Sequence, residues 1–177
     1  MSLLLKNIFR FIILMLIQVF VLDNIRLHYM VTPYLYLLFI IWLPFQMNRT
    51  WQMILAFVLG FTLDSFRHNP GFHASACVFI AYIRPFLINL LIPQEGAETN
   101  YDEPSIKSMG GLLPYIVYAG LLIFLHHAWL FFIEALQVGD VWYFFAKTML
   151  STILSLFLIL ATELFVNRKQ KFKTNTI

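Results

Sequence analysis

The stretch Leu112–Leu136 reads LLPYIVYAGLLIFLHHAWLFFIEAL and decides the fold class. It contains one carboxylate and no lysine or arginine. An α-helix rises about 1.5 Å per residue, so about 20 apolar residues cross the ~30 Å hydrocarbon core of a bilayer. The stretch is therefore predicted to be a transmembrane helix.

The composition of the whole chain supports the same class. Of 177 residues, 60% are hydrophobic and 12% are charged, whereas a soluble domain carries about 25% charged residues. A soluble protein of this length cannot hide that much apolar surface. This excludes a soluble enzyme, a disordered tail and a nucleic-acid-binding module. The one cysteine, Cys77, lies in an apolar run and is read as a small buried hydrophobe.

Six apolar runs are predicted to be membrane helices, which makes residues 1–177 a single all-α integral membrane domain. The first run resembles a signal peptide, but the residues after it lack a small-residue cleavage pattern, so we expect it to be retained. The predicted spans are Ile8–Asp23, Met30–Gln46, Trp51–Phe66, Phe72–Ile92, Leu112–Leu136 and Trp142–Val166.

The lysine and arginine residues predict the orientation, because cytoplasmic loops carry the excess of basic residues. With both termini in the cytoplasm, eight basic residues lie at the cytoplasmic ends and two in the outer loops. The cytoplasmic eight are Lys6, Arg10, Arg49, Lys107, Arg168, Lys169, Lys171 and Lys173, and the outer two are Arg26 and Arg67. Membrane lipids are therefore expected neighbours, and nucleic acid is not an expected partner.

The one long loop, Pro93–Gly111, is cytoplasmic in this topology and rich in acidic residues. It is either a solvated linker or a docking strip for a basic cytoplasmic partner.

Ionisable groups inside the predicted spans are candidates for function. Glu134 and Lys147 lie about 8 and 12 Å from the last outer turn on antiparallel helices, so we expect a structural ion pair. A proton or ion relay is the alternative.

For the remaining ionisable residues inside the predicted spans, we expect structural roles. His126 and His127 point about 100° apart on a helix and lack the spacing of a metal site, so neutral, hydrogen-bonded imidazoles are expected and no metal is predicted. Arg84 precedes Pro85 and is expected to bind carbonyls near the proline kink or a lipid phosphate, not Asp64.

The stretch 60–76 reads GFTLDSFRHNPGFHASA and predicts a tight polar hairpin at the outer surface. Gly60 and Asp64 are four apart, hence on one helical face, and Gly60 permits close contact with another helix. Asp64 falls at a helix C-terminus, where the macrodipole disfavours an anion. Arg67, His68 and His73 are the nearby side chains that could offset this. Binding of a partner or ligand is the alternative role.

This stretch resembles the MreD family of bacterial rod-shape-determining membrane proteins. The family pattern is a helix ending G-x-x-x-D, then a short turn to G-x-x-A/S, and it is matched by Gly60, Asp64, Gly71 and the segment 74–76. The first helix entering Val21–Asn24 and the second span bounded by Pro33 and Pro44 also fit.

The resemblance implies a non-enzymatic adaptor of the cell-elongation complex in the bacterial inner membrane, without a cofactor. Its implied partners are the periplasmic scaffold MreC, the actin homologue MreB, and the polymerase RodA with its penicillin-binding transpeptidase. The implied fold is similar to the six-helix substrate-binding subunits of energy-coupling-factor vitamin transporters. The partner-binding residues hypothesised here are Gly60, Asp64, Arg67, Gly71 and His73.

Two other functions stay open. A solute-binding subunit of a vitamin-type transporter would share the architecture. An intramembrane enzyme has less support, because no G-x-S-x-G motif occurs and the pair His73 and Ser75 is a weak indication of a nucleophile and its base. No catalytic residue is predicted.

Overall fold

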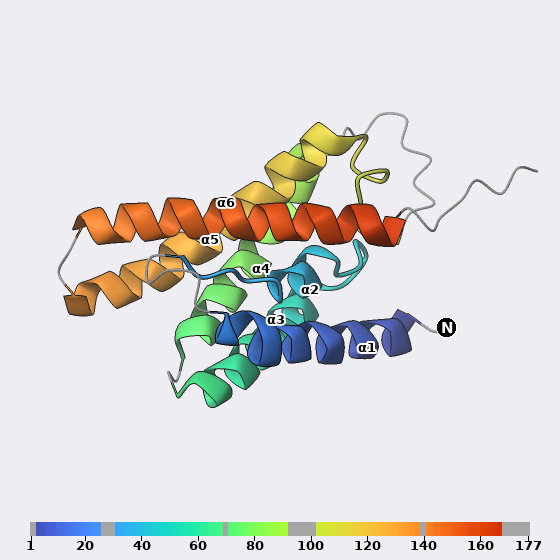
Figure 1. Cartoon of the computed structure of the whole chain (residues 1–177). Coiled ribbons are helices and arrows are strands. Elements are labelled where there is room, and N and C mark those ends of the chain that lie inside the picture. Colours follow the sequence, from blue (N-terminus) through green and yellow to red (C-terminus); the bar gives the residue numbers. More distant parts are fainter. Residues whose placement is uncertain (1–2, 26–30, 69–70, 92–101, 139–140, 168–177) are drawn as a thin grey trace, which may run out of the picture.

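The computed structural model describes residues 3–25, 31–68, 71–91, 102–138 and 141–167, and the regular elements within these ranges are helices (Figure 1). The all-α fold is thus confirmed. The helices are α1 (Leu3–Leu16), a π-helical turn (Ile17–Val21), a 3-10 turn (Leu22–Asn24), α2 (Leu37–Ile41), α3 (Arg49–Arg67), α4 (Phe72–Leu91), α5 (Leu112–Val138) and α6 (Val141–Asn167).

Four described helical stretches are long and apolar enough to cross a membrane, and they match four of the six predicted spans. They are Leu5–Asn24, Phe72–Leu91, Leu112–Leu136 and Val141–Val166. Helix α3 forms where the span Trp51–Phe66 was predicted, with Asn48 as its N-cap. It includes Asp64 and a basic residue at each end and is not among the four. The crossing by α3 stays a prediction.

The prediction of one helix over Met30–Gln46 is wrong. From residue 31, where the described chain resumes, to residue 36 the backbone is non-helical; it then forms the short helix α2 and turns towards α3. Proline at positions 33 and 44 removes backbone donors at both sides of α2. We call residues 31–48 the inner segment, because every residue from Tyr34 to Leu43 is buried. Non-helical backbone at membrane depth is tolerated only where protein or a water-filled cavity surrounds it.

The inner segment runs alongside α6. The backbone N–H of Thr32 donates to Ser151 Oγ at 3.0 Å, and the Trp42 indole donates to Glu163 at 2.6 Å. Ser151 and Glu163 are 12 residues apart on α6, which is about 18 Å along the helix axis. The inner segment therefore travels through the interior of the protein, in the direction that a second membrane pass requires.

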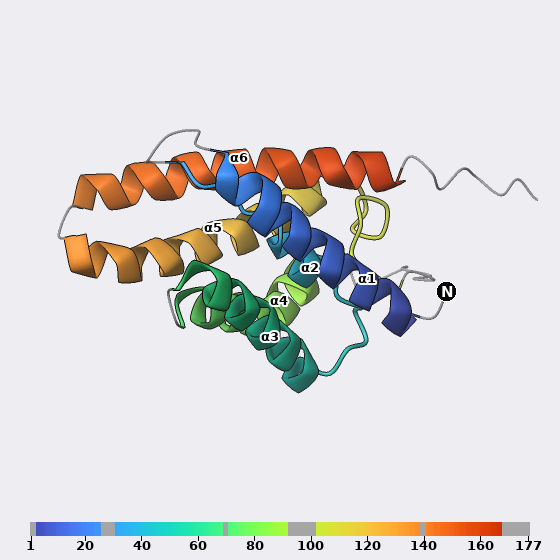
Figure 2. The same cartoon turned by 60° about the horizontal axis from the view of Figure 1, so that its bottom comes forward.

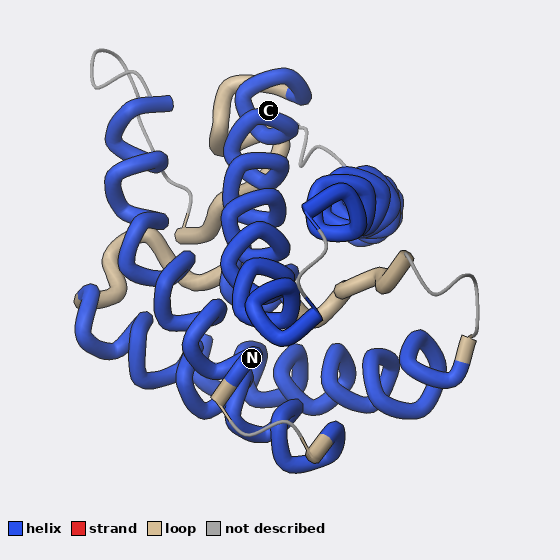
Figure 3. The backbone as a smooth tube through the Cα atoms, turned by 90° about the vertical axis from the view of Figure 1, so that its left-hand side faces the viewer, coloured by secondary structure: helices blue, strands red, loops and turns tan. Residues whose placement is uncertain are grey.

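The other helices lie in chain order around this segment. Helix α4 packs against α3 on one side and α5 on the other, and α6 packs against α5 (Figure 2). Helix α1 contacts the inner segment at α2. Helix makes up most of the described chain, as the blue tube in Figure 3 shows. Many outward apolar side chains are exposed, among them Phe9, Trp142 and Phe165.

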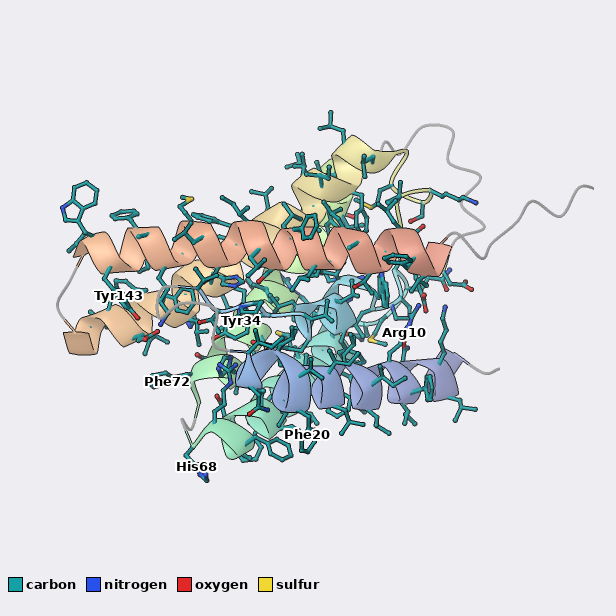
Figure 4. All side chains as sticks on the ribbon, viewed as in Figure 1. Arg10, Phe20, Tyr34, His68, Phe72 and Tyr143 are labelled. Carbon is teal, nitrogen blue, oxygen red and sulfur yellow. The ribbon has the colours of Figure 1, made fainter. Side chains whose placement is uncertain are left out.

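The molecule has two polar ends, which we name the Arg10 end and the Arg67 end (Figure 4 labels Arg10 at one and His68 at the other). At the Arg10 end, Lys6 and Arg10 each lie 2.8 Å from Glu103. At the Arg67 end, Arg67 pairs with Asp23. The Arg10 end is the one predicted to be cytoplasmic.

Candidate functional site

The candidate site is the hairpin between α3 and α4, built around Asp64. This residue lies in the last turn of α3 and is 2% exposed. Its carboxylate accepts the backbone N–H groups of Gly71 (3.0 Å), His73 (2.9 Å) and Ala74 (3.0 Å). The first amides of a helix lack intrahelical acceptors. Asp64 therefore caps α4 from the neighbouring helix, which offsets its unfavourable place at the end of α3.

Gly60 brings the two helices into direct contact one turn below Asp64. A Cβ atom at position 60 would lie 2.5 Å from Ala74 Cα and 2.6 Å from the carbonyl carbon of His73. His68 ends α3 with a φ of 57°, and Gly71 has a φ of 92°, a region that favours glycine. The tight polar hairpin expected from the sequence is present.

The side chains that were expected to offset the negative charge of Asp64 do not bind its carboxylate. The donors to Asp64 are backbone amides, whereas Arg67 pairs with Asp23, its Nε lying 2.9 Å from Asp23 Oδ2. Arg67 Nη1 also donates to the Tyr34 hydroxyl at 3.0 Å. Arg67 therefore joins α3 to the residues that follow α1 and to the inner segment.

A chain of hydrogen bonds leads inward from Arg67. Its Nη1 lies 3.3 Å from His73 Nε2, His73 Nδ1 lies 2.9 Å from the Tyr36 hydroxyl, and that hydroxyl lies 2.8 Å from His126 Nε2. A guanidinium only donates, so the network assigns the His73 proton to Nδ1 and directs the Tyr36 proton to His126. His126 Nδ1 then carries a proton and has no partner among the described residues.

His127 uses different partners from its neighbour. Its Nδ1 lies 2.7 Å from the carbonyl of Ile123, and its Nε2 lies 3.3 Å from Ser155 Oγ. Ser155 Oγ also accepts the backbone N–H of Tyr34 at 2.9 Å. His127 therefore helps to hold α6 against the inner segment. In the part of the chain that the structure describes, no three His, Cys, Asp or Glu side chains converge to hold a metal ion.

Gln18 is a buried residue that the sequence analysis missed. Its Oε1 accepts the N–H of Leu35 at 2.9 Å, and its Nε2 donates to the carbonyl of Pro33 at 3.1 Å and to Asp23 at 2.7 Å. It supplies the extended backbone with partners that a helix would have supplied internally. A lone amide within the apolar run 11–22 was the available signal.

Arg84 binds the backbone of the inner segment just after α2. It donates to the carbonyl of Leu43, to Gln52 Oε1 at 2.9 Å and to the Tyr118 hydroxyl at 2.8 Å. The expectation that Arg84 binds carbonyls near the kink at Pro85 or a lipid phosphate is wrong, because Arg84 is fully buried and the carbonyl that it binds belongs to the inner segment. Gln52 and Tyr118 were not singled out from the sequence.

Glu163 is the buried carboxylate of the Arg10 end, and the sequence analysis missed it as well. Besides the Trp42 indole, it accepts the Tyr115 hydroxyl at 3.2 Å and the Ile106 N–H at 3.3 Å. Together with Glu103, it fixes residues 102–111 against the protein. The acidic residues Glu95 and Glu98 lie outside the described residues, so the docking-strip hypothesis for Pro93–Gly111 stays a prediction.

The expected contact between Glu134 and Lys147 is present at the Arg67 end. Lys147 Nζ lies 2.6 and 2.7 Å from the two carboxylate oxygens and 3.0 Å from the Tyr143 hydroxyl. The pair joins α5 to α6 across their turn. The Glu134 side chain is 34% exposed and the Lys147 side chain 8% exposed, so the carboxylate lies at the edge of the protein and the ammonium group is buried.

The five residues hypothesised to bind a partner therefore divide into two groups. Gly60, Asp64 and His73 are buried and shape the hairpin, whereas Arg67 is half-buried and Gly71 is exposed. No protein-family model, curated protein or solved structure matches the chain. The described fold is that of an all-helical protein with four helices long and apolar enough to cross a membrane, and membership of the MreD family stays a prediction.

Proposed function

We propose that the chain is a six-pass, non-enzymatic adaptor of the cell-elongation complex in the bacterial inner membrane, where it binds an MreC-like scaffold and the peptidoglycan synthesis machinery. The observation that carries the proposal is the joint action of Gly60 and Asp64. The pattern behind the resemblance is one structural unit, in which the glycine sets the distance between two helices and the carboxylate caps the second.

The course of the chain supports six passes. Helices α1, α3, α4, α5 and α6 account for five, and the inner segment accounts for the remaining one as an unwound pass covered by protein. The Arg10 end then faces the cytoplasm and the Arg67 end faces outward, in agreement with the distribution of basic residues. MreB would meet the Arg10 end, and an MreC-like scaffold would meet the Arg67 end.

The surface that a scaffold would touch is formed by exposed residues of the hairpin. Phe66 is 56% exposed, and His68 and Gly71 are exposed beside it. The buried Asp64 and His73 position this surface and do not reach a partner themselves. Aromatic side chains are enriched at protein interfaces, which makes Phe66 a candidate anchor.

Affinity purification from gently solubilised membranes tests the proposal. The wild-type chain is expected to recover an MreC-like protein, and Phe66→Ala and His68→Ala are expected to recover less of it at equal abundance. Phe157→Ala, which removes an aromatic side chain 66% exposed on α6, is the matched control. Failure of the wild type to recover any cell-wall protein would contradict the proposal. A vitamin-sized ligand that raises the melting temperature of the purified protein would instead favour a transporter subunit.

A further inference from the structure

A groove of about 810 Å³ lies between α1 and α3 near the Arg10 end, and the hairpin site does not use it. Its walls are apolar: Ile8 and Phe11 come from α1, Trp51, Leu55 and Val58 from α3, and Phe39 from α2. A volume of this size, with apolar walls and few polar groups, is typical of sites for small molecules.

The length of the groove indicates its occupant. Along α3 it extends from Trp51 to Val58, which is about 10 Å of helix, and along α1 from Asn7 to Phe11, which is about 6 Å. One leaflet of the hydrocarbon core is about 15 Å deep. A partner transmembrane helix would need a contact along both leaflets, whereas the acyl chain of a single lipid needs only one.

The polar mouth of the groove indicates the head group. Asn7, Gln46, Asn48 and Asp102 line the groove at the Arg10 end, and among the described residues no lysine or arginine lines it. Asp102 is exposed, and its carboxylate has no ion pair or hydrogen bond to a described residue. The nearby Lys6 and Arg10 share the one carboxylate of Glu103, and neither of them lines the groove. A carboxylate attracts an ammonium group and repels an anionic head group.

Amide donors complete the mouth. The side-chain NH₂ groups of Asn7, Gln46 and Asn48 can donate to phosphate and ester oxygens. Trp51 is 61% exposed, and its indole N–H is a further donor of the kind that lies at membrane interfaces. The mouth therefore offers one anion to an ammonium group and several neutral donors to a phosphate.

We infer that the groove binds one phospholipid of the cytoplasmic leaflet whose head carries a primary ammonium, as in phosphatidylethanolamine. The ammonium lies at Asp102, and an acyl chain lies along Phe11, Phe39 and Leu55. This inference requires the chain to sit in a bilayer, and the choice of leaflet rests on the proposed orientation with the Arg10 end in the cytoplasm; it does not depend on the adaptor function.

Native mass spectrometry tests the site on the full chain, reconstituted in nanodiscs with equal amounts of phosphatidylethanolamine, phosphatidylcholine and phosphatidylglycerol bearing the same acyl chains. We expect bound phosphatidylethanolamine to exceed the other two. Asp102→Asn is expected to lower its ratio to phosphatidylcholine by about tenfold, the effect of one charge-assisted hydrogen bond.

Two substitutions that fill the groove, Val58→Trp and Ile8→Trp, are expected to reduce the retention of all three lipids. Ile153→Trp places the same bulk on an exposed position of α6 outside the groove and should leave retention unchanged. Equal retention of the three lipids, a preference for phosphatidylglycerol, or equal behaviour of the groove and control variants would overturn the inference. So would a photocrosslinker at position 58 that captures a protein helix and no lipid in intact membranes.

Discussion

The α3–α4 hairpin and the α5–α6 hairpin each hold two helices together near the Arg67 end, but they do so by different interactions. In the α3–α4 hairpin, a carboxylate binds the backbone of the opposite helix, and a glycine lets the two backbones touch. In the α5–α6 hairpin, a carboxylate binds an ammonium group, and Gly120 has only a side-chain atom of Leu156 within reach. The first arrangement is fixed by main-chain atoms that cannot move away, whereas the second depends on flexible side chains. We therefore expect substitutions in α3–α4 to have the larger effects.

The same substitution in both hairpins should give the largest difference. Gly60→Ala forces a Cβ atom to within 2.5 Å of the α4 backbone, while Gly120→Ala meets only Leu156 Cδ2 at 3.7 Å. Overpacking against backbone should destabilise the Gly60 variant by about 3 kcal/mol, and Gly120→Ala should be neutral or slightly stabilising. Unfolding in detergent, followed by circular dichroism, measures both. Similar stabilities of the two variants would remove the distinction between the hairpins.

Loss of the cap should have the next largest effect. Asp64→Ala leaves two amide groups of α4 and that of Gly71 just before it without their acceptor, and we expect a loss of about 2–3 kcal/mol. Asp64→Asn keeps one carbonyl oxygen and should fall between the alanine variant and the wild type. The same unfolding measurement applies. An asparagine variant less stable than the alanine variant would show that the cap is not the main role of Asp64.

The hydroxyl groups of α6 test whether the inner segment depends on its neighbours. Ser155→Ala removes the acceptor for the Tyr34 amide and a partner of His127, so a loss of about 1–2 kcal/mol is expected. Ser65→Ala is the matched control, because Ser65 is exposed and bonds only the carbonyl of Phe61 in its own helix. Equal stabilities of the two serine variants would contradict this role of Ser155.

The ion pair should have the smallest effect. Glu134→Gln leaves the buried Lys147 with the Tyr143 hydroxyl and with the amide oxygen of the glutamine, and position 134 is partly exposed, so a loss of about 1 kcal/mol is expected. Adding Lys147→Met to the Glu134→Gln variant should cause little further loss of stability, because the main partner of each residue is the other one. A double-mutant cycle measures the coupling. A coupling free energy much larger than that of a surface ion pair would show that the α5–α6 hairpin contributes as much to stability as the α3–α4 hairpin does.

The sequence predicted the long helices well and the inner segment badly, for one physical reason. Helices α4, α5 and α6 are apolar over the length of a bilayer, and lipid accepts such a surface only as helix. The inner segment is equally apolar, but protein surrounds it, and Gln18, Ser151 and Arg84 supply its backbone with partners. Composition does not distinguish a helix in lipid from an unwound segment in protein. Pro33 and Pro44 mark its limits without revealing its conformation.

The sequence predicted several residues of the candidate site but did not predict the hydrogen-bond partners of those residues. Gly60 and Asp64 were recognised as one helix face, since their spacing fixes that. That the carboxylate binds backbone amides depends on the path of the turn, which no side-chain pattern encodes. The partners of Tyr34 and Tyr36 come from distant segments of the chain, so no local pattern predicts them.

Labelling of single cysteines with a membrane-impermeant maleimide tests the six-pass arrangement most directly. In a background with Cys77→Ala, Gln46→Cys reports on the Arg10 end and His68→Cys on the Arg67 end, since both positions are exposed. We predict that intact cells label position 68 only, that permeabilised cells label both, and that Leu37→Cys in the buried inner segment is labelled in neither. Labelling of positions 46 and 68 from the same side of the membrane would contradict the account.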